Sequence, residues 1–357
     1  MNKTIYMILT NGFDPDIRVL KEAKYISTLG YNIEIICWDR KNKYKNNVEE
    51  VENIKIRRFS IPSVPGTGFK QIIPFFKFIH KTKKYLKDKD VQFLHCHDLD
   101  GLIVGYISTL FKKEKKLIFD MHEMYQHYKF GKFKSIFSFL VKKSTYIIYV
   151  NDEQIKDMQE KENLIYLPNY PVKANYTPIE KTTNNSQIRL NYIGFLRDQK
   201  SIDTLIKFGK ENNNVTIGLY GTGVLYEKLK DQKLKNCKIY GEFNGEKDIG
   251  KIYQNTDILY CVYNPEIKNW RTCYPVKLYE AIITCTPVIV SEGTKAGELV
   301  KEKQIGECIK FEDIESLKTA VDKIRQNYEK YVENLSIISN DYLWEEVNKN
   351  LDKIYKV

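Results

Sequence analysis

The sequence predicts an α/β protein in which two parallel sheets, each covered by helices, follow one another along the chain. Short apolar runs alternate with amphipathic segments from end to end, which is typical of strand-helix-strand units. The length of 357 residues favours two domains. The segment 170–187 has two prolines, a polar cluster and no helix or strand periodicity, so it predicts the linker. We therefore expect two Rossmann-like domains facing a central cleft, formed by residues 1–170 and 171–340.

In the first half, seven short apolar runs are expected to be strands. They are residues 4–9, 32–38, 54–59, 91–95, 116–119, 145–150 and 164–167. Between them, the segment 15–29 places Ile17, Leu20 and Ile26 roughly on one helical face, which predicts an amphipathic helix. The segment 99–112 is apolar enough to be a crossover helix that covers the sheet.

The alternation restarts after the linker. We expect strands at 188–193, 215–219, 238–240, 258–262 and 287–290, and helices from Ser201, near Leu225, and over 247–254 and 276–283. The tail, 314–357, is expected to be helical throughout, with Asp341 as the N-cap of a final helix over 341–357.

The composition limits the classes of protein and partner. With 42% hydrophobic and 29% charged residues the chain is an ordinary globular protein, not a disordered or fibrous one. The net charge of +11 favours acidic partners: phosphorylated small molecules, an anionic membrane or nucleic acid. No recognised nucleic-acid module is present, so nucleic acid is not an expected partner. The seven scattered cysteines, without a C-x-x-C pair, indicate reduced thiols and a cytoplasmic location.

The segment 70–88 mixes aromatic and aliphatic residues with six lysines. Such a helix could lie on the anionic face of the inner membrane, which would make the protein peripheral. It could equally pack on the sheet and leave a basic face in solvent. The sequence shows neither a signal peptide nor an apolar stretch of about 18 residues, so we expect no membrane span.

Two motifs of the second half predict a phosphate site, because ligands of parallel sheets bind beyond the carboxyl ends of the strands. In YGTG, Gly221 and Gly223 could bring backbone N–H groups to a phosphate, or could form an ordinary strand-to-helix turn. In YPVKLYEA, a helix start at Pro275 with Lys277 in its first turn suits a diphosphate, and Glu280 suits ribose hydroxyls. The alternative there is an amphipathic helix with solvated charges.

We expect no metal site. The D-x-D pairs at 98–100 and 14–16 precede expected helices, where carboxylates cap free N–H groups. His95, His97 and His122 raise the question of zinc, but His95 and His97 are expected on opposite faces of one strand. His122 follows an apolar strand among acidic residues, so it faces a ligand or is an ordinary hydrogen-bonded histidine.

Taken together, the motifs resemble the GT-B glycosyltransferases, specifically the large retaining, family-four-like group that uses nucleotide sugars. The resemblance rests on NGFDPDIRVLKEAKYISTLGY, HCHDLDG, FDMHE, PNY, YIGFL, YGTG, KLYEAIITCTPVIVSEG and LWEEVNKNLDKIY, in this order and spacing. It implies that the first domain holds the acceptor and the second the sugar donor. It also implies that the final helix crosses back to the first domain, and that neither metal nor cofactor is needed.

The resemblance implies a set of site residues. The catalytic ones are His122 beside the donor sugar, Lys200 at the diphosphate and Glu280 at the ribose. The donor-binding ones are Gly12, Phe195, Arg197, Gly221, Gly223, Tyr240, Glu242, Phe243, Arg271, Pro275, Lys277 and Leu278. Two positions depart from the family pattern: Phe195 replaces an arginine, and Thr272 replaces the first glutamate of an E-x7-E pair.

The expected reaction is transfer of a hexosyl unit from a UDP- or GDP-sugar to a hydroxyl of a cell-envelope glycan or lipid-linked acceptor, with retention. Two alternatives remain open. A nucleotide-sugar epimerase shares the fold, and a non-catalytic nucleotide-sugar-binding or regulatory protein could have kept the fold without turnover.

Overall fold

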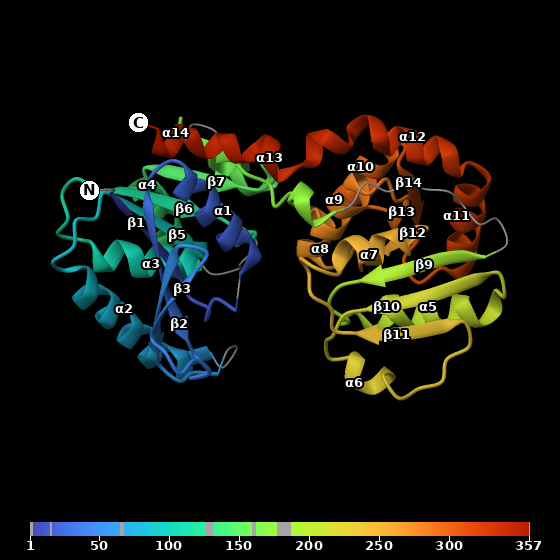
Figure 1. Ribbon diagram of the computed structural model, residues 1–357, viewed down its shortest axis with the longest axis horizontal. Coiled ribbons are helices and arrows are strands. Elements are labelled where there is room, and N and C mark those ends of the chain that lie inside the picture. The colour runs from blue at the N-terminus through green and yellow to red at the C-terminus, as the bar shows by residue number, and fades with distance from the viewer. Residues whose placement is uncertain are drawn as a thin grey trace. The chain divides into compact units, whose positions relative to one another are not determined.

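The computed structural model describes residues 3–14, 16–64, 68–125, 131–158, 162–176 and 187–356. The chain forms two compact units (Figure 1). Unit 1 consists of Met1–Pro168 together with Val347–Val357, and unit 2 consists of Asn169–Glu346. Each is an α/β unit built on a parallel sheet, which confirms the predicted fold class.

The sheet of unit 1 has eight strands in the order β3-β4-β2-β1-β5-β6-β7-β8. Only β3 is antiparallel to its neighbour. The strands are β1 (Thr4–Leu9), β2 (Asn32–Asp39), β3 (Val48–Val51), β4 (Ile54–Ser60), β5 (Phe93–His97), β6 (Lys116–Asp120), β7 (Tyr146–Tyr149) and β8 (Leu164–Tyr166). The central strands β1, β2 and β5 are buried almost throughout because helices cover both faces, which explains their continuous apolar runs.

Four helices accompany this sheet: α1 (Ile17–Thr28), α2 (Ile72–Leu86), α3 (Asp98–Ser108) and α4 (Gly131–Lys143). The N-cap of α1 is Asp16, whose carboxylate accepts a hydrogen bond from the Val19 N–H at 3.3 Å. The inner face of α2 buries Phe78, whose ring stacks on that of Trp38 with centroids 5.5 Å apart. These contacts tie α2 to the core of unit 1.

The sheet of unit 2 has six parallel strands in the order β11-β10-β9-β12-β13-β14. They are β9 (Ile188–Ile193), β10 (Val215–Tyr220), β11 (Cys237–Gly241), β12 (Ile258–Cys261), β13 (Val288–Ser291) and β14 (Gly306–Ile309). The helices are α5 (Gln199–Glu211), α6 (Tyr226–Leu229), α7 (Ile249–Gln254), α8 (Lys268–Thr272), α9 (Val276–Ile283), α10 (Lys295–Lys303), α11 (Ile314–Gln326) and α12 (Tyr328–Ile338).

Each sheet has one strand at which the order reverses. In unit 1 it is β1, which pairs with β2 on one side and β5 on the other. In unit 2 it is β9, between β10 and β12. Ligands of open parallel sheets bind beyond the carboxyl end of such a strand, so the loops after β1, β5, β9 and β12 are the places to examine for a site.

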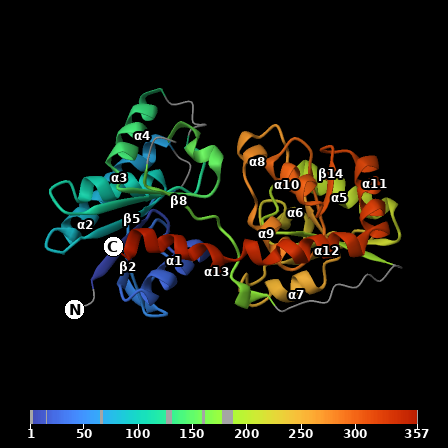
Figure 2. The same cartoon turned by 90° about the horizontal axis from the view of Figure 1, so that it is seen from above.

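The C-terminal segment 347–357 joins unit 1. It contains the 3-10 turn Asn348–Leu351 and the short helix α14 (Asp352–Tyr355), and Figure 2 shows it beside α1. The Tyr25 hydroxyl of α1 donates to Asp352 at 2.7 Å, and the Asn350 amide donates to the Tyr166 carbonyl at 2.9 Å. The resemblance had implied such a return to the first domain.

The expected single helix from Asp341 is wrong. Asp341 lies inside the 3-10 turn Ser339–Tyr342. The backbone is extended at Leu343, so the helical structure stops there, and a separate helix, α13 (Trp344–Val347), begins after it. No element was expected at β3, α4, α8, α10 or β14. Among the described residues, no helix is long and apolar enough to cross a membrane.

Candidate active site

Lys277 is a buried lysine at the start of α9. This helix begins after Pro275, which provides no side-chain cap, and the Lys277 side chain lies over the Tyr192 ring with Nζ 3.8 Å from the centroid. Among the described residues, Nζ has no hydrogen-bond partner. Burial lowers the pKa of Lys277 to about 8. An unpaired buried ammonium is costly, so this side chain is poised to receive an anion.

Two glycine turns lie against this lysine. Gly194 follows β9 with φ +126°, and a Cβ placed on it would lie 3.2 Å from Lys277 Nζ. Gly221 follows β10 with φ +124°, and a Cβ there would lie 2.1 Å from the Gly194 carbonyl oxygen. The turns therefore approach so closely that Gly221 has no room for a side chain, and at Gly194 the positive φ disfavours one. This is the strand-reversal point of the unit 2 sheet.

Glu280 lies one turn along α9 and is held by two tyrosines. The Tyr176 hydroxyl donates to Glu280 Oε1 at 2.9 Å, and the Tyr253 hydroxyl lies 3.1 Å from Oε2 and 3.0 Å from the Lys277 carbonyl oxygen. Burial and the nearby carboxylate raise the pKa of Tyr253, so it stays a donor. The sequence analysis missed both tyrosines because nothing distinguishes them among 26 in the chain.

The neighbouring strand ends bring further candidates to the same edge of the sheet. The Gly221 N–H donates to the Gly241 carbonyl at 2.7 Å, which joins the loop after β10 to the one after β11. At the ends of these two strands, the Tyr240 ring of β11 stacks on the Tyr220 ring of β10 with centroids 4.1 Å apart. The remaining candidates near these loops are buried Leu278, half-buried Gly223 and Phe243, and exposed Glu242 and Phe195.

The other cationic candidates differ from Lys277. Arg197 lies over the Trp270 ring, 5.4 Å from its centroid, and Arg271 is exposed on α8. Lys200 is exposed, and its Nζ lies 3.0 Å from Glu312 Oε2. Lys200 would have to leave Glu312 to bind a phosphate, whereas Lys277 needs no such exchange.

In unit 1, Asp120 is the centre of a buried polar cluster at the ends of β5 and β6. Arg18 Nη2 lies 2.6 Å from Asp120 Oδ1, and both His97 Nδ1, at 3.0 Å, and His122 Nε2, at 2.9 Å, lie within hydrogen-bond distance of Oδ2. Burial alone would raise the pKa of Asp120, but Arg18 and His122 hold it well below its usual range. Asp120 is therefore an ionised acceptor.

His122 lies between two carboxylates. Besides Asp120, it has Asp98 Oδ2 3.7 Å from its Nδ1, and its backbone N–H donates to Asp98 Oδ1 at 3.2 Å. Burial and Arg18 act to lower the pKa of His122, but Asp120 and Asp98 outweigh them and raise it. Gly12, the donor-binding candidate of unit 1, follows β1, and its carbonyl accepts from Arg58 Nε at 2.9 Å.

The structure contradicts two expectations about this cluster, one for the histidines of β5 and one for Asp98. His95 and His97 do not point to opposite faces: residues two apart on a strand share a face, and their rings stack with centroids 4.5 Å apart. Asp98 does not cap α3, because its φ is +62° and its carboxylate turns to His122 and the Tyr125 hydroxyl.

Because His95 and His97 share one face of β5, a metal site in this cluster has to be considered. Potential ligand atoms of Glu22, His95, His97 and Asp120 all lie within 4.8 Å of one another. However, Arg18 already pairs with both carboxylates, at 3.1 Å from Glu22 and 2.6 Å from Asp120. A guanidinium in this position already supplies positive charge to both carboxylates, so the cluster does not need a metal for its charge balance.

Comparison with known proteins assigns both halves of the chain to glycosyltransferases. The family profile "Glycosyl transferases group 1" matches residues 178–337, and the profile "Glycosyltransferase Family 4" matches residues 17–163. No curated protein matches the chain in sequence.

Solved structures of the same fold cover nearly the whole chain. Sucrose-phosphate synthase (tll1590) from Thermosynechococcus elongatus has a TM-score of 0.76 at 13% identity, covering 99% of this chain and 98% of its own. Anabaena HepE in complex with UDP-glucose has a TM-score of 0.70 at 13% identity, covering 99% and 100%. A putative UDP-N-acetylglucosamine 2-epimerase from Listeria monocytogenes has 0.65 at 9% identity, covering 99% and 98%. These likenesses establish the fold, and the two profiles add the family: the chain belongs to the GT-B glycosyltransferases.

Proposed function

We propose that the protein transfers a hexosyl unit from a UDP- or GDP-sugar to a hydroxyl of a cell-envelope glycan or lipid-linked acceptor, with retention and without a metal or other cofactor. The observation that carries the proposal is Lys277, a buried amine without a hydrogen-bond partner among the described residues, set against Gly194 at the strand reversal of unit 2. UDP-glucose bound to HepE, a protein of the same fold, supports a nucleotide-sugar donor.

In the proposed reaction, the bond between C1 of the sugar and the diphosphate oxygen breaks, and a bond to the acceptor oxygen forms on the same face. The acceptor's proton passes to the departing phosphate oxygen. Lys277, Arg197 and the α9 start would stabilise the charge that grows on the diphosphate. Glu280, fixed by its two tyrosines, would accept hydrogen bonds from ribose hydroxyls, and His122 would donate one to the sugar.

The test combines binding with turnover. Calorimetric titration with UDP and GDP identifies the base, and incubation with a panel of sugar nucleotides, read by NMR, reports hydrolysis, transfer and the anomeric configuration of the product. Transfer with retention supports the proposal. Tight nucleotide binding without hydrolysis or transfer would support the non-catalytic alternative, and appearance of an epimeric sugar nucleotide would support the epimerase.

Activity is expected to survive treatment with EDTA, because Arg18 supplies positive charge to the cluster around Asp120 and Lys277 supplies it to the proposed diphosphate site. The assay compares EDTA-treated protein before and after adding Mg²⁺ or Zn²⁺. Loss of activity that either ion restores would contradict the metal-independent reaction.

Nucleotide affinity is expected to fall about tenfold between pH 7 and pH 9. Lys277 has a pKa of about 8 in the free protein, and an adjacent diphosphate favours its charged form. Binding therefore takes up a proton above pH 8, and each further pH unit weakens it about tenfold. UDP titrations across this range measure the slope. In Lys277→Arg, which stays charged, the slope should flatten; an equally steep slope there would exclude Lys277 as its source.

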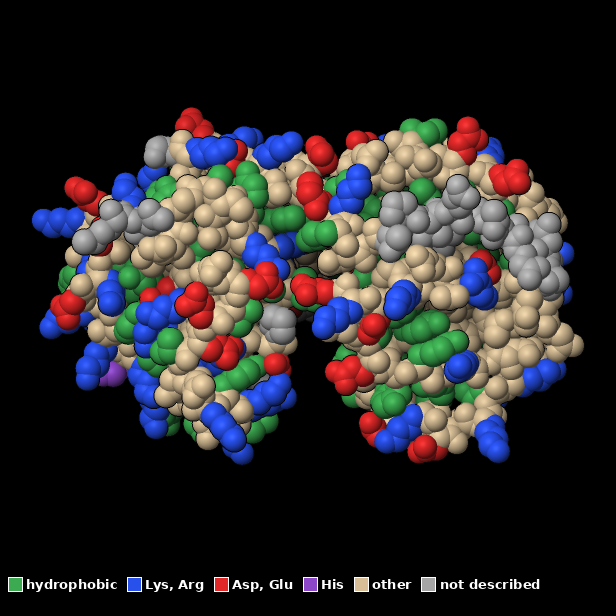
Figure 3. Space-filling model, viewed as in Figure 1, with side chains coloured by type: hydrophobic (Ala, Val, Ile, Leu, Met, Phe, Trp, Pro, Cys, Tyr) green, Lys and Arg blue, Asp and Glu red, His purple; other side chains and the backbone are tan. Residues whose placement is uncertain are grey.

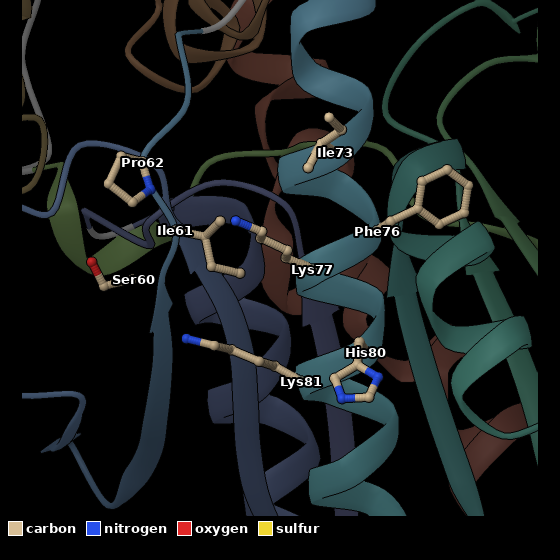
Figure 4. A pocket seen from close by; sticks show the side chains of 8 residues that line it. All are labelled: Ser60, Ile61, Pro62, Ile73, Phe76, Lys77, His80 and Lys81. Atoms are coloured by element: carbon tan, nitrogen blue, oxygen red, sulfur yellow. The ribbon is translucent and has the colours of Figure 1, made fainter.

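We further propose that the outer face of α2 rests on an anionic membrane that carries the acceptor. Ile73 and Phe76 of α2 are 68 and 60% exposed, and Phe69 of the preceding 3-10 turn Gly68–Gln71 is 91% exposed. They adjoin a surface pocket of about 620 Å³ lined by Ser60, Ile61, Pro62, Ile73, Phe76, Lys77, His80 and Lys81 (Figure 4). In Figure 4, the two lysines extend from α2 toward the segment after β4.

Basic and apolar side chains on one helix face are the combination that binds anionic bilayers. Elsewhere on the visible surface, Lys and Arg are spread over both units (Figure 3). The face of α2 therefore combines lysines with exposed apolar residues on one helix, although large exposed apolar side chains also occur elsewhere, such as Phe111 and Ile337.

Replacing Lys77, Lys81 and Lys84 with glutamine is expected to weaken binding to phosphatidylglycerol vesicles about 100-fold. Each lysine near an anionic surface contributes about 1 kcal/mol. Co-sedimentation measures the partitioning, and Lys301, Lys318 and Lys330, exposed in unit 2, provide a charge-matched triple control. Equal partitioning of the two triple variants would show that α2 is only a packing element.

A further inference from the structure

We propose that Tyr355, in the C-terminal segment, is a positioning residue for His122, acting through the buried histidine pair of β5. The inference rests on the proposed function only in placing His122 at the reacting centre. Tyr355 is 2% exposed, and its hydroxyl lies 2.9 Å from His95 Nδ1. A series of side-chain contacts thus runs from Tyr355 through His95, His97 and Asp120 to His122. Every contact lies within unit 1.

The charges around His95 decide which of its nitrogens carries the proton. Its Nε2 lies 3.6 Å from Glu22 Oε2 and 3.7 Å from Asp120 Oδ2. At these separations neither contact is a hydrogen bond, and burial together with Asp120 raises the pKa of Glu22 to about 8, so the preference comes from Asp120. An N–H facing ionised Asp120 is favourable, whereas a lone pair facing it is repelled. Burial lowers the pKa of His95, so the ring is neutral and has a single N–H. With that N–H at Nε2, Nδ1 is an acceptor, and the Tyr355 hydroxyl is the donor that it needs.

Tyr355 therefore holds His95 in the tautomer that supports Asp120. His97 Nδ1 and His122 Nε2 lie within hydrogen-bond distance of Asp120 Oδ2, and His95 Nε2 faces the same oxygen at 3.7 Å, so the three imidazoles surround one carboxylate oxygen. His122 competes with its neighbours for this acceptor, and a change at His95 alters the strength of the His122 bond. The ionisable groups facing the cluster are Arg18, Lys21 and Glu22 of α1, His95 and His97 of β5, Asp98 of α3, Asp120 of β6 and Tyr355 of α14.

Tyr355→Phe removes one hydroxyl and keeps the ring that packs against Phe93, with centroids 5.3 Å apart. The matched control is Tyr31→Phe, which removes a hydroxyl from the same aromatic group. Tyr31 donates to the Tyr355 carbonyl at 2.7 Å, so its loss leaves the histidines untouched. Both variants are made in the full-length chain, and thermal unfolding checks that each is folded.

The first readout needs no substrate. Histidine-selective ¹⁵N NMR reports the tautomer of His95 and the titration of His122, with His95→Gln and His122→Gln assigning two of the five histidines. In Tyr355→Phe, His95 should become a mixture of tautomers, and the His122 midpoint should rise because Asp120 loses a competing donor. His95→Gln should move the midpoint in the same direction. Unchanged spectra in Tyr355→Phe, or an equal change in Tyr31→Phe, would overturn the proposal.

The second readout separates this proposal from the proposed function. We expect kcat to fall about tenfold in Tyr355→Phe, the effect of one net hydrogen bond, with KM for the donor unchanged and the pH profile shifted with the His122 midpoint. A shifted NMR titration with unaltered kcat would support the positioning role and contradict the role of His122 in transfer. No change in either readout would overturn the positioning role.

Discussion

Replacing Lys277 with methionine is expected to lower kcat/KM by about 10²–10³, the effect of losing one preorganised contact to a developing charge. Methionine replaces the aliphatic part of the side chain with an unbranched apolar one of similar size and removes the ammonium group over Tyr192. Because Lys277 binds the diphosphate in the ground state as well, UDP affinity should fall along with kcat. Calorimetry and initial-rate kinetics measure the two effects separately.

The same substitution should stabilise the fold. In the folded protein the pKa of Lys277 is about 8, against 10.5 for an ordinary lysine, which corresponds to a cost on the order of 3 kcal/mol at pH 7. Between pH 8 and 10.5 the unfolded chain binds more protons than the folded one, so this cost is complete below pH 8 and disappears above 10.5. Urea unfolding at pH 7 should therefore show Lys277→Met to be more stable than the native protein.

The control is Lys301→Met on α10, where the lysine side chain is 63% exposed. It should change neither turnover nor stability by more than about 0.5 kcal/mol. If Lys277→Met bound UDP as the native protein does, the anion site would have to lie elsewhere in unit 2.

Gly221→Ala is expected to cost at least about 3 kcal/mol in the free energy of unfolding. Its φ of +124° is essentially restricted to glycine, and the new Cβ would lie 2.1 Å from the Gly194 carbonyl oxygen. The clash is with backbone, so the turns after β9 and β10 must separate. Because Gly194 lies against Lys277, any folded fraction should also bind UDP poorly.

Gly293→Ala provides the matched control. Gly293 also has a positive φ, +70°, but no atom lies within 4 Å of its Cβ position, so only the backbone preference of about 1 kcal/mol is lost. Urea midpoints and UDP titrations of the two variants measure the difference. Similar urea midpoints for the two variants would show that the stability of the protein does not depend on the close contact between the turns after β9 and β10.

The fold could be predicted because apolar runs buried on both faces leave a strong signal. β1 and β9 begin and end where the sequence analysis placed them. The strands that were missed lack this signal: β3, VEEV, is an edge strand with charged residues, and β14, GECI, is an edge strand buried only at its two ends. β5 lies two residues later than predicted, so His97 falls inside the strand.

The candidate site could be predicted only where chemistry and local sequence coincide. Lys277 and Glu280 belong to one helix start, so a single motif contains both. Their partners, Tyr176 and Tyr253, are distant in sequence, and only the packed unit joins them to Glu280. Phe195 and Thr272 stay unexplained departures from the family pattern; Thr272 is buried, and its hydroxyl donates to the Lys268 carbonyl at 3.0 Å.

The membership of residues 347–357 in unit 1 has a consequence for biosynthesis. On the ribosome, the eight-stranded sheet is complete long before α14, whose Asp352 accepts a hydrogen bond from Tyr25 of α1, has been made. The surface of unit 1 that contacts α14 therefore stays uncovered while the residues of unit 2 are synthesised. A nascent chain stalled before Val347 would therefore be open to chaperones and proteases at that uncovered surface.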